Sequence, residues 1–272
     1  MIIDGHAHAC GSYNGVESIE KYLIQHKIDK VVLCGGEPNS KKDYSYPMMS
    51  NLFTGEKLGY IFNRIIRKVT ALHNLSQQID EQNQFVYEIS KELPNQVANV
   101  YWINPVEEDC MEKMQKFYKT KGFKLIKMHQ CWTSFSLDCD NCHSIFQWAK
   151  MQNIPVFIHL VSRKQVEIFA EIANQYSDTY FIIAHMIGAD YLSEKIKKDN
   201  VYWDLSAPQL YSIRILKKIL NKYGAKKLLL GSDTPYGKNN IESVIKRLNK
   251  LGISKDDMEA ISYKNIVKLM RF

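Results

Sequence analysis

The sequence lacks the segments that would direct a chain into or across a membrane. No apolar run approaches the ~20 residues of a transmembrane helix. The opening stretch, MIIDGHAHAC, has neither the basic region nor the cleavage site of a signal peptide. We therefore expect a cytoplasmic protein without a membrane partner.

The chain also has no block of one charge that would mark a nucleic-acid-binding tail. Its net charge of +7 comes from 36 Lys and Arg against 29 Asp and Glu. The lysines are scattered over amphipathic stretches such as LSEKIKKDN, which is typical of a solvated helix face. With 45% hydrophobic residues the chain has enough apolar material for a full core. We expect a small-molecule substrate, no nucleic-acid partner and, as one option, a homo-oligomer.

Cysteine is scarce, and the six cysteines suggest no disulfide framework in a chain without an export signal. One group, CDNCH (Cys139, Cys142 and His143), has the spacing of a c-type haem attachment site. Haem attachment requires export, so a redox pair or a zinc knuckle would be the next alternatives. We expect reduced thiols where a loop leads into a helix.

Short apolar runs rich in β-branched residues recur eight times along the chain, and stretches of helical periodicity separate most of them. The runs occupy residues 2–8, 30–36, 97–105, 123–129, 155–160, 180–186, 201–206 and 227–233. Continuous apolar strands alternating with amphipathic helices indicate parallel strands covered by helices. Eight such units without an internal repeat predict an α/β protein with a closed (β/α)8 TIM barrel, as a single domain over residues 1–272.

One segment, residues 37–95, interrupts this alternation. It begins like a loop (EPNSKKDYSYPMMSN) and then becomes helical. Because a barrel needs only one helix there, we predict a helical insertion between strands 2 and 3 that caps the site. The tail, 254–272, opens with a Ser and an acidic first turn, which predicts a final helix on the outside of the barrel.

Five of the eight histidines fall at the carboxyl ends of predicted strands, where barrels of this type carry their chemistry. His6 and His8 stand one residue apart, so a strand would point both imidazoles the same way. His129, His159 and His185 complete the five. This placement on one rim predicts a metal site, and Asp233 after LLLGS adds an oxygen ligand or a base.

These residues carry a family resemblance. DGHAH, IHL, IIAHMIG and LLLGSDTPYG together resemble the amidohydrolase superfamily, and more closely its amidohydrolase-2 branch of metal-dependent hydrolases and decarboxylases. The resemblance implies a barrel with one or two divalent metals at the strand ends. It also implies that His6, His8 and His159 are metal ligands and that Asp233 completes the set or bridges to a water.

The resemblance leaves the number of metals open. In mononuclear members the residue at the place of His185 stands beside the metal and polarises substrate or water, whereas in binuclear members it binds a second ion. Those members carry a carboxylated lysine or a carboxylate on the fourth strand. This sequence offers Lys127 and His129 there, and neither is a clear match. We favour one ion, zinc, with manganese or a second ion as alternatives.

The chemistry of such a site follows from its residue types. Zinc lowers the pKa of water toward about 7, Asp233 can accept its proton, and His185 can stabilise an oxyanion. Lys127, His129 and Arg163 could hold a substrate carboxylate. We predict a metal-dependent hydrolase acting on a C–N or C–O bond of a small anionic substrate. A non-oxidative decarboxylase of an aromatic or unsaturated acid is the alternative, and an idle metal-binding barrel is a third reading.

Overall fold

The fold is built on eight parallel strands that follow one another in chain order. The computed structural model describes residues 1–46, 48, 50 and 57–272. The strands are β1 (Ile3–His8), β2 (Lys30–Cys34), β3 (Val97–Trp102), β4 (Leu125–His129), β5 (Val156–His159), β6 (Phe181–Ile183), β7 (Val201–Asp204) and β8 (Leu228–Leu229). Nearly all their residues are buried, as expected for parallel strands with helices on their outer face.

The chain after β8 closes the sheet against β1. Gly5 N donates to Leu230 O at 2.9 Å, and a Cβ on Gly5 would lie 2.6 Å from that oxygen, so only glycine permits this approach. The buried carboxylate of Asp4 accepts from the backbone N–H of Ser232 at 2.8 Å and from its hydroxyl at 2.6 Å. The predicted (β/α)8 barrel is therefore confirmed.

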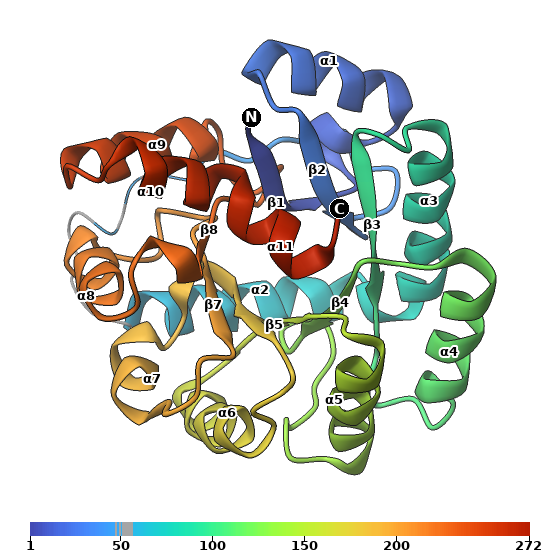
Figure 1. The fold of residues 1–272 in the computed structure, drawn as a ribbon. Helices are drawn as coiled ribbons and strands as arrows, with labels where there is room; N and C mark the ends of the chain where they lie inside the picture. The colour runs from blue at the N-terminus through green and yellow to red at the C-terminus, as the bar shows by residue number, and fades with distance from the viewer. Residues whose placement is uncertain (47, 49, 51–56) are drawn as a thin grey trace.

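A ring of helices surrounds the strands (Figure 1). Its members are α1 (Val16–His26), α3 (Ile79–Glu92), α4 (Cys110–Lys121), α5 (Asp140–Gln152), α6 (Arg163–Gln175), α7 (Ala189–Lys195), α8 (Ile213–Tyr223) and α9 (Asn240–Lys250). Short 3-10 turns stand at Gly11–Tyr13, Leu75–Gln78, Ala184–Met186 and Ala225–Lys227. Serine side chains cap α6 and α8, at Ser162 and Ser212. The larger apolar core fills the space between strands and ring.

One additional helix, α2 (Lys57–Leu72), lies over the carboxyl ends of the strands. In Figure 1 it crosses behind the barrel. Its Asn63 donates to Leu160 O at 2.8 Å, just after β5. Within the predicted insertion, α3 packs on β3 as an ordinary ring helix, so the addition is α2 with the chain leading to it. Residues 47, 49 and 51–56 of the predicted cap lie outside the described part of the chain.

The predicted final helix forms, but its predicted place on the outside of the barrel is wrong. Ser254 caps α10 (Lys255–Glu259), a π-helical turn follows at Ala260–Lys264, and α11 (Asn265–Met270) ends the chain. The apolar side chains of α11, including Ile266 and Leu269, pack on inward-facing strand residues in a second core cluster. The helix thus closes the amino end of the barrel, opposite α2 (Figure 1).

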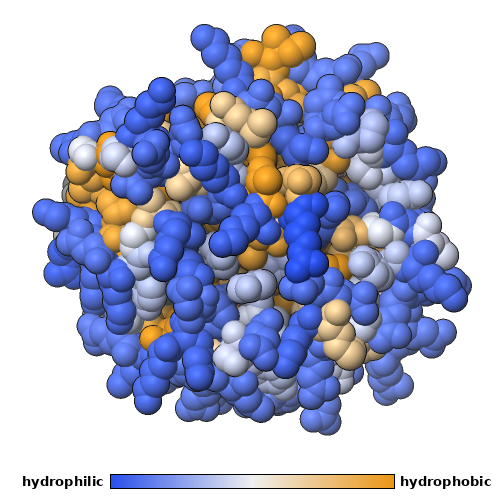
Figure 2. Space-filling view, viewed as in Figure 1, coloured by the Kyte–Doolittle hydropathy of each residue, from blue (hydrophilic) through white to orange (hydrophobic). Residues whose placement is uncertain are grey.

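The face of the molecule that carries α11 is mostly hydrophilic. Figure 2 shows apolar residues in scattered patches among charged and polar ones. Among the helices that the structure describes, none is long and apolar enough to cross a membrane.

Candidate metal centre

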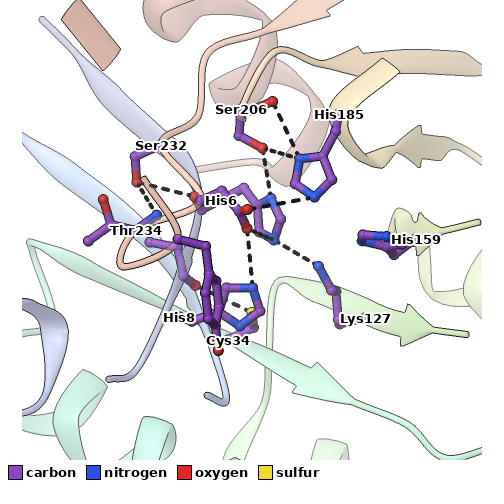
Figure 3. Close-up of polar contacts among 12 residues, drawn as sticks. His6, His8, Cys34, Lys127, His159, His185, Ser206, Ser232 and Thr234 are labelled. Atoms are coloured by element: carbon purple, nitrogen blue, oxygen red, sulfur yellow. Dashed lines mark hydrogen bonds and ion pairs between the residues drawn. The ribbon is translucent and has the colours of Figure 1, made fainter. Parts of the chain in front are cut away.

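The predicted metal and catalytic residues meet at the carboxyl end of the barrel (Figure 3). His6 and His8 end β1, and His159 ends β5. His185 follows β6, and Asp233 follows β8. Their exposed fractions are all 8% or less. The strand order therefore brings together five side chains that lie far apart in the sequence.

Two of these histidines share one hydroxyl partner. Ser206 Oγ lies 3.0 Å from His6 Nδ1 and 2.9 Å from His185 Nδ1. The same hydroxyl donates its proton to Asp204 Oδ2. Because a hydroxyl has a single proton, its oxygen must accept from both imidazoles. His6 and His185 are thereby held as Nδ1–H tautomers whose Nε2 lone pairs face Asp233.

The Nδ1 of His8 has a different partner. It donates to Gly35 O at 2.7 Å, so the Nε2 of His8 faces Asp233 Oδ1 at 3.4 Å. His6 Nε2 lies 3.7 Å from Oδ1, and His185 Nε2 lies 3.8 Å from Oδ2. Three imidazole nitrogens and a carboxylate thus converge: His6 and His185 present Nε2 lone pairs, and the Nε2 of His8 is the ion-pair partner of the carboxylate.

His159 offers the opposite ring nitrogen. Its Nε2 lies 2.8 Å from Asn63 Oδ1. The amide of Asn63 is oriented by its own NH2 group, which donates to Leu160 O at 2.8 Å and Val161 O at 3.3 Å. His159 must therefore carry its proton on Nε2. Its buried Nδ1 has no hydrogen-bond partner in the described structure, and such an orphaned lone pair is a natural metal ligand.

Lys127 brings a buried amine to this cluster. Its Nζ lies 2.7 Å from His6 Nε2 and 4.0 Å from the centre of the Phe157 ring. The residue is 1% exposed. Burial lowers the pKa of Lys127, although Cys34 and Asp233 act in the other direction.

His129 belongs to the opposite side of the barrel mouth. Its ring stacks on His159 at 4.0 Å and on Trp102 at 5.6 Å. Its Nδ1 accepts from the backbone N–H of Cys131 at 3.2 Å. It is therefore packed beside the predicted ligand His159 at the end of the neighbouring strand.

The electrostatics keep most of these imidazoles neutral. Burial, followed by the positive charges of neighbouring groups, holds the pKa of His6, His129 and His159 well below the usual value. Neutral imidazole is the form that binds a metal.

Two groups at the centre carry charge instead. Burial opposes the ionisation of Asp233, but His185 and the β1 histidines keep its pKa below the usual value, so it is a carboxylate. Burial also opposes protonation of His8, yet Cys34 and Asp233 raise the pKa of His8 to about 10. The carboxylate thus attracts positive charge to the centre of the cluster.

The backbone at two of these positions is strained. His185 has φ 52° and Asp233 has φ 58°, in the left-handed region that non-glycine residues rarely occupy. Such conformations persist only where the surroundings enforce them, and they concentrate at functional sites. Here they aim both side chains inward.

Arg163 makes contacts at the start of α6. It is the first residue of α6, it pairs with Glu167 at 2.9 Å, and its guanidinium stacks over Tyr191 at 3.9 Å. Its side chain is 46% exposed. Its role in substrate binding stays a prediction, as do those of Lys127 and His129.

Three supporting residues were not among the predicted site residues. Asp204 and Ser206 stand in VYWDLS, where a polar pair at a strand end could have signalled them. Asn63 stands in the insertion, within an amphipathic helical pattern that gives no such signal.

The donor set fits a divalent cation. Among the described residues, three groups each offer three potential ligand atoms within 4.8 Å of one another: His6, His8 and Cys34; His129, Cys131 and His159; and His6, His185 and Asp204. The buried Nδ1 of His159 has no partner among the described residues, and the Nε2 lone pairs of His6 and His185 face the Asp233 carboxylate. Such an acceptor-rich cavity requires a cation, which imidazole nitrogens and a carboxylate bind well.

The fold and this centre define an α/β barrel with a histidine-rich candidate metal site. The chain belongs to the Amidohydro_2 family of amidohydrolases, whose family model matches residues 67–272. The matched range contains His159, His185 and Asp233, while His6 and His8 precede it. The comparison with curated proteins gave no match.

Several solved structures share the fold over nearly the whole chain. A probable 2-pyrone-4,6-dicarboxylic acid hydrolase from Acinetobacter baumannii with citric acid bound is 15% identical, with a TM-score of 0.66 and coverage of 100% of this chain and 99% of that one. A 4-oxalomesaconate hydratase from Rhodopseudomonas palustris is 14% identical, with a TM-score of 0.63 and coverage of 100% and 96%. A dihydroxybenzoic acid decarboxylase from Polaromonas with bound manganese and 2-nitroresorcinol is 13% identical, with a TM-score of 0.64 and coverage of 99% and 96%. At these identities the likeness concerns the fold, and one fold hosts different reactions.

Proposed function

We propose that this protein is a metal-dependent hydrolase that acts on a C–N or C–O bond of a small, anionic substrate. The observation that carries the proposal is the convergence of His6 Nε2, His8 Nε2 and His185 Nε2 on the Asp233 carboxylate, within 3.4 to 3.8 Å. His6, His8, His159 and Asp233 would hold one divalent ion, with zinc favoured and manganese or a second ion as alternatives. When bound, the ion supplies Lewis acidity and makes water acidic near neutral pH.

The chain's own residues then move the protons. Asp233 is a carboxylate within 3.8 Å of His185 Nε2, so it can accept the proton of the attacking water and exchange it with that nitrogen. His185 already gives its Nδ1–H to Ser206. It would therefore stabilise an oxyanion as an imidazolium, once Nε2 has received a proton.

The same centre also supports a second candidate, non-oxidative decarboxylation of an aromatic or unsaturated acid. Two partly exposed aromatic side chains flank the histidines. The Tyr236 ring lies 5.2 Å from His8, and the Trp132 ring lies 6.3 Å from His129. Flat walls of this kind suit a planar substrate, and Asp233 would deliver the proton that replaces the carboxyl group.

In either reaction we propose that the substrate carboxylate is held by Lys127, His129 and Arg163. We also propose a cytoplasmic, reducing environment. The six cysteines, all of them free thiols, support this proposal.

The experiment begins with the metal content of the purified protein, measured by mass spectrometry. We expect roughly one equivalent of zinc or a similar ion in the wild type, as a one-ion zinc-like shell implies. We expect loss of the ion in His6→Ala. His143→Ala is the matched control, because His143 contacts Tyr176 outside the centre.

Loaded and chelator-stripped protein are then screened with small amides, lactones and aromatic acids. Release of acid supports hydrolysis, and release of carbon dioxide supports the second candidate. Full turnover by metal-free protein would contradict both candidate functions. Lys127 would then be the group that takes the place of the ion at the centre.

A further inference from the structure

The cysteine pair of the CDNCH motif begins α5, beside α4 in the ring (Figure 1). Cys139 is the N-cap residue, with extended backbone at φ −79° and ψ 155°, and Cys142 is the third residue of the helix. Groups at the N-cap and third positions of a helix face each other closely enough to hydrogen-bond, as in a capping box. Cys139 and Cys142 occupy these two positions at the start of α5.

The two thiols differ in access and in acidity. Cys142 is fully buried, and its Sγ also lies 3.6 Å from Ser136 O, whereas Cys139 is partly exposed. The thiol of Cys142 and the backbone N–H groups of Cys142 and Asn141 lower the pKa of Cys139 to about 6, against an opposing effect of burial. The neighbouring Cys139 sulfur and burial raise the pKa of Cys142. The helix start therefore presents an accessible thiolate backed by a buried, protonated thiol.

Two other uses of this motif fit the structure poorly. In the described part of the chain, the groups of three or more potential metal ligands include neither cysteine. Haem attachment would need both sulfurs accessible and a free histidine. Cys142 is buried, and His143 Nδ1 lies 2.7 Å from Tyr176 OH. The remaining chemistry for a paired thiolate and thiol is exchange with a disulfide.

We propose that Cys139 and Cys142 form a thiol–disulfide exchange site for disulfides of low-molecular-weight thiols. The Cys139 thiolate attacks one sulfur of the small disulfide, forms a mixed disulfide and releases one small thiolate. Cys142 then loses its proton and attacks Cys139 Sγ, forming the intramolecular disulfide and releasing the second small thiolate. The protein dithiol is oxidised by two electrons, and the small disulfide is reduced to two thiols.

The first test equilibrates the intact protein with mixtures of oxidised and reduced glutathione, traps free thiols and maps the disulfides by peptide mass spectrometry. We expect a Cys139–Cys142 disulfide that forms as the oxidised fraction rises and is fully reversed by dithiothreitol. Cys110→Ser is the matched control, because Cys110 is a buried cysteine at the start of the neighbouring α4, and it should leave the disulfide unchanged. Absence of the disulfide, a bond to Cys110, or zinc bound by the pair would overturn the proposal.

The second test separates the roles of the two sulfurs. In Cys142→Ala the mixed disulfide with glutathione should accumulate at Cys139, because no thiol remains to displace it. Alkylation of Cys139 by iodoacetamide in the wild type should show a midpoint near pH 6. At pH 6.5 the variant should react about fivefold more slowly, since its smaller thiolate fraction outweighs the higher nucleophilicity of a more basic thiolate. Equal rates in both proteins, with circular dichroism confirming that both are folded, would count against the proposed activation.

Discussion

The two sides of the barrel mouth support their histidines in different ways. On one side, His6 and His185 form hydrogen bonds with Ser206 and Asp204, which belong to β7 and the residues directly after it. On the other side, His159 forms a hydrogen bond with Asn63, which belongs to the additional helix α2. The first support is part of the barrel, whereas the second was brought to it by an insertion.

The two supports also differ in redundancy. His6 Nδ1 has two oxygen partners, Ser206 Oγ at 3.0 Å and Asp204 Oδ2 at 3.3 Å. Among the described residues, His159 Nε2 has one side-chain partner, Asn63. Losing a single partner should therefore disturb the β5 side more than the β1 side. Asp233 faces the histidines of the β1 side. Replacing it should therefore have a larger effect on the protein than replacing either Asn63 or Ser206.

The largest effect is expected for Asp233→Asn. The amide keeps the size and one oxygen of the carboxylate but accepts no proton near neutral pH. We expect most of the metal to be retained while turnover falls by about 10²–10⁴, the usual contribution of a general base. Metal content and kcat are measured on the same preparation, with Asp178→Asn as the control because Asp178 is an exposed surface partner of Lys150. Near-normal turnover with metal bound would move the proton carrier to His185.

The next largest effect is expected for Asn63→Leu, which is similar in size but removes the acceptor that holds the His159 proton on Nε2. His159 then loses its fixed tautomer, and metal affinity should fall by about 10–100-fold, as for other partners that orient a ligand. Affinity is measured by competition with a chromophoric chelator, and nitrogen NMR of the ring reports the tautomer directly in metal-free protein.

Thr70→Val is the matched control for that experiment. Thr70 lies on the same helix, is 5% exposed and donates to Cys131 O at 2.7 Å, but it does not bond to His159. If both variants lose metal equally, α2 acts only by covering the site, and the proposed role of Asn63 is wrong.

The smallest effect of the three is expected for Ser206→Ala. Asp204 still accepts from His6 and orders the backbone of His185. The variant loses the hydroxyl's bonds to His6, His185 and Asp204. Both imidazoles keep a second oxygen within reach, Asp204 Oδ2 for His6 and the Ser206 carbonyl for His185, so we expect a net loss of about 1 kcal/mol, or about fivefold in metal affinity. Ser193→Ala serves as the control, since Ser193 is buried and donates to Asp190 O three residues earlier within α7. If Ser206→Ala lost more metal affinity than Asn63→Leu, the β1 side would depend on a single partner more than the β5 side does.

Much of the barrel and its rim could be predicted because their signals are local. A parallel strand buried on both faces appears as a short apolar run, and residues two apart on a strand share a face. The pair of His6 and His8, the histidine that ends β5 and the aspartate after β8 follow from these two rules and from strand order. The final helix was predicted from its Ser254 cap, but its place was not. An apolar helix face fits either the outside of the ring or the open end of a barrel.

The sequence by itself therefore determined the number and order of strands, the rim on which the histidines gather and the family to which they belong. Only the tertiary structure decided which nitrogen each histidine presents, because that depends on partners far away in the chain. The Oδ1 of Asn63 reaches His159 across 96 residues, and the Oγ of Ser206 reaches His6 across 200. A hydrogen bond is set by distances of a few tenths of an ångström between such groups. Periodicity within one segment carries no information about them.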